Sequence, residues 1–82
     1  MQVRVKLMGT LRSKLPPGTP GGVAALEVEP GTTVADVLGR LGIGGGHVHL
    51  VLVNGGMETD RQRVLGEADE LTVFPPVAGG AV

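Results

Sequence analysis

The 82-residue sequence contains no cysteine, tryptophan or tyrosine, and its single phenylalanine is Phe74. Without cysteine the chain can form no disulfide, thiolate metal site or thiol nucleophile. With almost no aromatic residues, its core must be built from Val, Leu, Ile and Met. An excess of one charge is also lacking, because seven Lys and Arg oppose eight Asp and Glu, for a formal net charge of −1. Nothing in this balance indicates a nucleic-acid partner.

Long apolar runs are missing as well. The N-terminus alternates charged and apolar residues, which excludes a signal peptide and a membrane span from the expected features. We therefore expect a cytoplasmic protein with no membrane partner. The length suits one small domain, and 15 Gly and 6 Pro predict frequent loops.

Alternation of apolar and polar side chains predicts the strands. Residues 12–22 hold three prolines and three glycines, so we expect a loop there. The pair Asn54-Gly55 tolerates positive φ and predicts a turn. The strands are expected at residues 2–7, 23–29, 48–53, 57–59 and 70–74.

One helix is expected between the second and third strands. Thr33 can cap its first turn, Asp36 completes a capping box, and Gly42 is suited to its C-terminal end. The order of elements predicts an α+β domain with one main helix on a mixed sheet of four to five strands. This is the plan of the β-grasp, or ubiquitin-like, fold, with the last strand parallel to the first in the middle of the sheet.

The C-terminal end cannot continue regular structure. Pro75 and Pro76 lack backbone donors and end sheet pairing. We place the domain at residues 1–75 and a flexible tail at residues 76–82. The tail residues after the prolines are small, which suits insertion into a narrow channel of another protein; they are Val77, Ala78, Gly79, Gly80, Ala81 and Val82.

Residues 49–53 are apolar on both alternating faces, although a single helix can cover only one face of the sheet. An exposed apolar patch should therefore remain, and such patches usually bind partners. One assignment places Met8, Val51, Val53 and Phe74 at this partner-binding face. The reverse assignment of the third strand, or loops that cover the patch, are the alternatives.

Other candidate chemistry is weak. His47 and His49 have a spacing compatible with metal, but two ligands do not make a site, and no metal is expected. The glycines at residues 42–46 follow a helix, whereas phosphate loops precede one. The acidic residues Asp60, Glu67, Asp69 and Glu70 are expected on a solvated face, or on an electrostatic docking edge. We therefore expect a non-enzyme.

Six segments together form a pattern that extends over the whole sequence. They are Val3-x-Val5-x-Leu7, Thr10-Leu11-Arg12, GTTVADVL at 31–38, Val53-Asn54-Gly55, Ala68-Asp69-Glu70 and FPPVAGG at 74–80. With these segments the sequence resembles the MoaD/ThiS family of sulfur carriers. The terminal block is more similar to the MoaD type, the small subunit of molybdopterin synthase, than to the thiamine type.

This resemblance implies a carrier that acts with partner enzymes. In the family, a ubiquitin-activating-type adenylyltransferase uses ATP to adenylate the terminal glycine. Sulfide equivalents convert the adenylate to a thiocarboxylate, the sulfur donor for a partner such as the synthase large subunit. By position, Gly80 would carry the sulfur and Gly79 would allow close approach. The resemblance implies no bound cofactor, since the activating enzyme uses the ATP.

Three departures from the family pattern stand out. Ala81 and Val82 follow Gly80, so its carboxyl group lies in a peptide bond, and we expect a protease to remove them. Met8 stands where an aromatic is common, and the Pro/Gly-rich loop replaces a helical segment. The alternatives are a modifier joined through Gly80 to lysines of other proteins, and a non-reactive interaction module. The sulfur acceptor and the oligomeric state stay open.

Overall fold

A computed structural model describes residues 1–16 and 19–76. Five strands and one α-helix form its framework, joined in part by three 3₁₀ helices. The strands are β1 (Gln2–Leu7), β2 (Val23–Glu27), β3 (Leu50–Val53), β4 (Gly56–Met57) and β5 (Glu70–Phe74). The helices are α1 (Val34–Arg40), η1 (Gly9–Lys14), η2 (Pro20–Gly22) and η3 (Gly45–His47).

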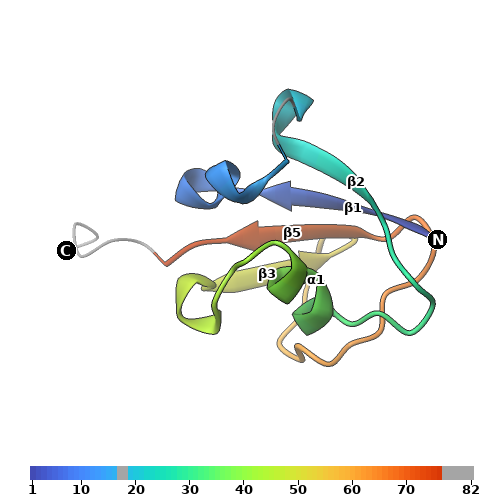
Figure 1. Cartoon of the computed structure of the whole chain (residues 1–82). Coiled ribbons are helices and arrows are strands. Elements are labelled where there is room, and N and C mark those ends of the chain that lie inside the picture. Colours follow the sequence, from blue (N-terminus) through green and yellow to red (C-terminus); the bar gives the residue numbers. More distant parts are fainter. Residues whose placement is uncertain (17–18, 77–82) are drawn as a thin grey trace.

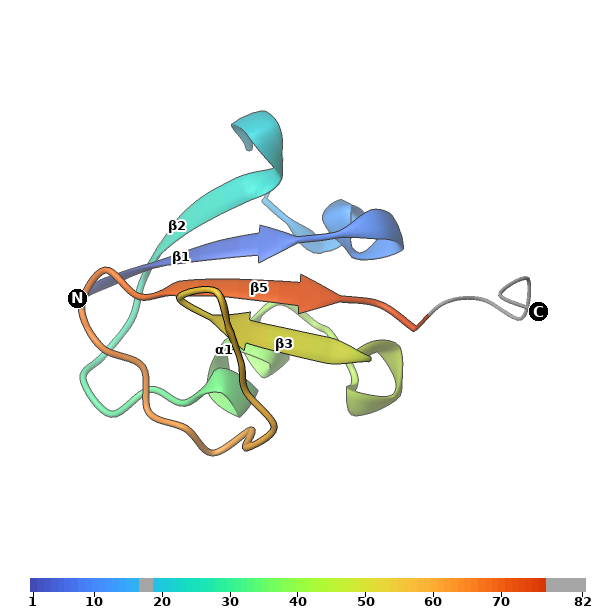
Figure 2. The same cartoon turned by 180° about the vertical axis from the view of Figure 1, so that it is seen from behind.

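The five strands form one mixed sheet in the order β2-β1-β5-β3-β4. β1 pairs in parallel with β5, and the other pairings are antiparallel. Helix α1 covers one face of the sheet (Figure 1), and the view from behind shows the opposite, open face (Figure 2). The predicted sheet, with the last strand beside the first at its centre, is confirmed.

An aliphatic core lies between α1 and the sheet. Within the described residues no polar or charged side chain is buried. The fully buried side chains include every second residue of β1 and β5, facing the apolar stripe of α1. They are Val3, Val5, Leu7, Val34, Val37, Val51, Leu71 and Val73.

Helix α1 has the predicted end signals. The Thr33 hydroxyl accepts from the Asp36 amide at 3.1 Å, and the Asp36 carboxylate accepts from the Thr33 amide at 3.0 Å. At the other end Gly42 has a φ of +74°, and the Ile43 amide donates to the Leu38 carbonyl at 2.9 Å. This is a Schellman motif, which glycine allows at no steric cost. Among the described residues no helix is long and apolar enough to cross a membrane.

Several boundaries differ from the prediction. The expected loop from residue 12 is partly occupied by η1, because the buried side chain of Leu11 fastens this segment to the core. β2 ends two residues early at Glu27, and β3 begins two residues late at Leu50. The edge strand is β4, at Gly56–Met57 rather than residues 57–59.

Candidate functional site

The root of the C-terminal tail leaves the sheet from its centre. The Met8 amide donates to the Val73 carbonyl at 3.0 Å, and the His49 amide donates to the Phe74 carbonyl at 2.8 Å. The end of β5 is thus held from both neighbouring strands, and η1 and η3 lie on either side of it (Figure 1). The tail therefore begins at a fixed position on the sheet.

The predicted tail is described only at its start. Pro75 is half-buried and Pro76 is exposed, in keeping with the end of sheet pairing at Phe74. Val77, Ala78, Gly79, Gly80, Ala81 and Val82 lie outside the described residues. The domain boundary and the roles of these six residues therefore stay predictions.

An apolar patch lies on the open face beside this root. Leu50 pairs with Phe74, and Leu52 pairs with both Thr72 and Met57. Since alternate residues of a strand share a face, these side chains point away from α1. We define the apolar patch as Met8, Leu50, Leu52, Met57 and Phe74, of which Met57 is 70% exposed and the others are half-buried.

The prediction that Val51 and Val53 bind a partner is wrong. They pair with Val73 and Leu71 on the helix-covered face, where they are only 0% and 4% exposed. The reverse assignment of β3 is the correct one, so the sequence interpretation missed Leu50, Leu52 and Met57. The predicted residues Met8 and Phe74 do lie on the open face, and their role in binding stays a prediction.

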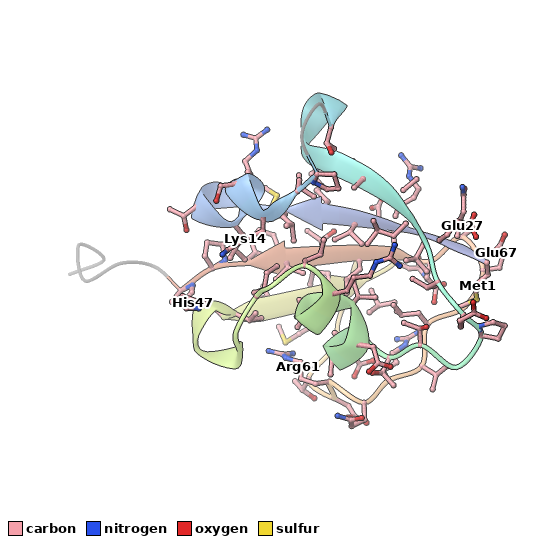
Figure 3. All side chains as sticks on the ribbon, viewed as in Figure 1. Met1, Lys14, Glu27, His47, Arg61 and Glu67 are labelled. Carbon is pink, nitrogen blue, oxygen red and sulfur yellow. The ribbon has the colours of Figure 1, made fainter. Side chains whose placement is uncertain are left out.

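The two ends of the sheet carry different ionisable side chains. Figure 3 shows Lys14 of η1 and His47 of η3 at this end, and Glu27 and Glu67 at the opposite end beside Met1. The sequence contains no acidic residue between Met1 and Leu26 or after Glu70. Lys14 lies at the end of the sheet that carries the root, and Glu27 and Glu67 lie at the other end.

The two histidines of the metal-compatible spacing lie outside the strands. His47 ends η3 and His49 precedes β3, and both side chains are exposed. Among the described residues no group of three or more His, Asp or Glu side chains could hold a metal ion.

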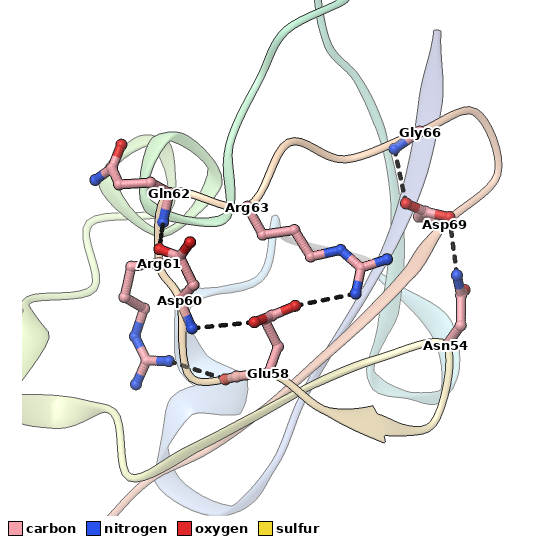
Figure 4. Close-up of polar contacts among 8 residues, drawn as sticks. All are labelled: Asn54, Glu58, Asp60, Arg61, Gln62, Arg63, Gly66 and Asp69. Atoms are coloured by element: carbon pink, nitrogen blue, oxygen red, sulfur yellow. Dashed lines mark hydrogen bonds and ion pairs between the residues drawn. The ribbon is translucent and has the colours of Figure 1, made fainter.

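The acidic residues near β5 are engaged with loop backbone (Figure 4). Asp69 accepts from the Gly66 amide at 2.7 Å and from the Asn54 side-chain amide at 2.9 Å. These two bonds, in that order, lower the pKa of the Asp69 carboxyl. The pKa of Glu58 is lowered mainly by the Asp60 amide and then by Arg63, whose guanidinium lies 3.0 Å away. These carboxylates order the segment between β4 and β5.

Comparison with known proteins shows the same architecture elsewhere. The model of the ThiS family matches residues 5–80. The Haloferax volcanii HVO 2177 protein is 28% identical, with 98% of this chain and 87% of that chain covered and a TM-score of 0.75. No curated protein matches the chain.

Two further solved structures are similar in fold. SAMP1 from Haloferax volcanii, small archaeal modifier protein 1, is 24% identical over 98% of this chain and 100% of that chain, with a TM-score of 0.70. A chain of the complex of subunits 1 and 2 of molybdopterin-converting factor from Helicobacter pylori is 18% identical, with 98% and 100% covered and a TM-score of 0.62. The fold is thus the ubiquitin-like β-grasp.

Proposed function

Because this chain belongs to the ThiS family, we propose that it is a sulfur carrier whose working group is the carboxylate of Gly80. The observation that carries the proposal is the extent of the family match, which reaches Gly80 and leaves Ala81 and Val82 outside. The root supports it, since β5 delivers the tail from the centre of the sheet beside the apolar patch. Molybdopterin is the sulfur acceptor we propose, in line with the MoaD-type terminal block.

The chemistry explains why the tail is small and why the carrier acts with partner enzymes. A carboxylate is a poor acyl donor, so an activating enzyme first joins it to AMP from ATP and releases pyrophosphate. Sulfur from a sulfide equivalent then displaces AMP and leaves a thiocarboxylate on Gly80. Glycines let the backbone enter both partner sites without side-chain clash. The chain itself binds no cofactor in this scheme.

Two kinds of partner follow from the scheme. One is a ubiquitin-activating-type adenylyltransferase, and the other is a synthase large subunit that takes the sulfur. The Helicobacter pylori complex joins two subunits of molybdopterin-converting factor, which supports a large-subunit partner. The Gly80–Ala81 peptide bond must be cleaved first, so we also propose a processing protease.

Intact mass spectrometry tests this proposal. Chains that end at Val82, Gly80 and Gly79 are each incubated with the activating enzyme of the native host, ATP and a sulfide source. We expect only the chain ending at Gly80 to gain the mass difference between sulfur and oxygen, because the other two present a different terminal carboxylate. Circular dichroism of the three chains checks that each is folded. A folded chain ending at Gly80 that is never adenylated would refute the carrier function.

A second candidate is a protein modifier, favoured by the fold shared with SAMP1. Here the activated Gly80 would be transferred to a lysine of another protein. Proteomics of the native host decides between the two, since a modifier leaves target lysines joined to the tryptic segment of this chain from Val64 to Gly80, and a carrier leaves none.

A further inference from the structure

Gly9 lies against the root of the tail. A Cβ atom added to Gly9 would lie 3.1 Å from Cγ and 3.6 Å from Cδ of Pro75. The distance of 3.1 Å is shorter than nine in ten contacts of real Cβ atoms. Among the described glycines it is the one whose added side chain would contact Pro75. The backbone of residue 9 therefore forms the surface on which the proline ring rests.

Gly9 is itself held in place. The Met8 amide is bonded to Val73, and the Leu11 amide donates to the Met8 carbonyl at 3.1 Å, while the Leu11 side chain is buried. The φ of Gly9 is +54°, which turns the chain from β1 into η1. The proline ring fixes the φ of Pro75 and restricts the residue before it. Few torsions are left free where the tail begins, and contact with Gly9 limits them further.

We propose that Gly9 is a positioning residue that sets the direction in which the tail leaves the domain. The proposal rests on the proposed function, because direction matters only if Gly80 must reach an active site. The neighbouring patch residues Met8 and Phe74 fix the root relative to a docked partner. Gly80 follows Pro75 by five residues, which can span at most about 18 Å. A misplacement of about 1 Å at a reacting group can cost about 100-fold in rate.

The test compares Gly9→Ala with Gly31→Ala on the chain ending at Gly80. Gly31 has a φ of +93°, and a Cβ added there would meet no atom within 4 Å, so Ala is strained at this position without contacting the tail. Adenylation is followed by pyrophosphate release at varied carrier concentration. We expect Gly9→Ala to lower kcat about 10-fold with KM within about twofold, since the apolar patch is unchanged. Gly31→Ala should match the parent in both constants.

Rescue separates positioning from loss of structure. Pro75→Ala removes the ring atoms that a Cβ at residue 9 would meet. In that background, adding Gly9→Ala should no longer lower kcat. Equal kcat for Gly9→Ala and Gly31→Ala, or an undiminished effect of Gly9→Ala when Pro75 is absent, would overturn the proposal.

An activity-independent measurement distinguishes this inference from the proposed function. In NMR spectra, Gly9→Ala should shift the Val77 amide signal and weaken the nuclear Overhauser contact between residues 9 and 75, whereas Gly31→Ala should change neither. If the parent chain is never adenylated, the carrier function fails, and these spectra alone decide whether Gly9 sets the path of the tail. Unchanged spectra for Gly9→Ala refute it.

Discussion

Replacing Met57 by Ala should weaken the complex with the proposed activating enzyme. Met57 lies in β4 opposite Leu52 and is 70% exposed, so it contributes little to the folded domain alone. Complete burial of a Met side chain is worth about 1.5–3 kcal/mol, and a partner that covers the exposed part gains about 1–2 kcal/mol. Truncation to Ala forfeits most of this, which raises Kd about five- to thirtyfold.

Val64 provides the matched control for Met57. It is the other large hydrophobic side chain that is well exposed among the described residues, at 56%, and it pairs with Thr33 outside the apolar patch. Isothermal titration calorimetry of the chain ending at Gly80 gives Kd for the parent, Met57→Ala and Val64→Ala. If Met57→Ala stays within about twofold of the parent, or Val64→Ala loses as much, the apolar patch is not the docking surface.

Three further predictions concern stability. Asp69→Asn should make Tm fall less steeply at acid pH. Because the pKa of Asp69 is lower in the folded chain than its ordinary value of 3.8, the carboxylate stabilises the fold above pH 3.8. This stability is lost as the pH falls through the pKa of the folded chain. A fall of Tm at acid pH that Asp69→Asn leaves unchanged would contradict this. Thr33→Ala should cost about 1 kcal/mol in urea unfolding through the lost cap, and no loss would mean that the cap is inert. Leu71→Ala in the central strand should cost about 2–5 kcal/mol by the same measurement; a cost below about 1 kcal/mol would show that the core relaxes around the cavity.

Features that depend on nearby residues could be predicted from the sequence. The capping box of Thr33 and Asp36 and the C-terminal Gly42 work through backbone groups within one turn. Asn54 and Gly55, with φ of +51° and +83°, make the predicted turn for the same reason. The strands and their order along the chain could be predicted largely because apolar and polar residues alternate in strands such as β1.

Features that depend on distant pairing could not be predicted. Both faces of β3 are apolar in the sequence, so only its register with β5 decides that Val51 is buried and Leu50 is not. The contact between Gly9 and Pro75 joins the two ends of the chain and has no local signal. The buried Leu11 that orders η1 was hidden for the same reason.

The parallel pairing of β1 with β5 has a mechanical consequence. The N-terminus and the tail root lie at opposite ends of these adjacent strands (Figure 2). Tension applied between Met1 and the tail therefore loads the hydrogen bonds of this pair together in shear, whereas tension on a hairpin opens its bonds one after another. A partner that pulls on the tail while the N-terminus is held must therefore break the hydrogen bonds between β1 and β5 together, which resists unfolding more than breaking them in turn.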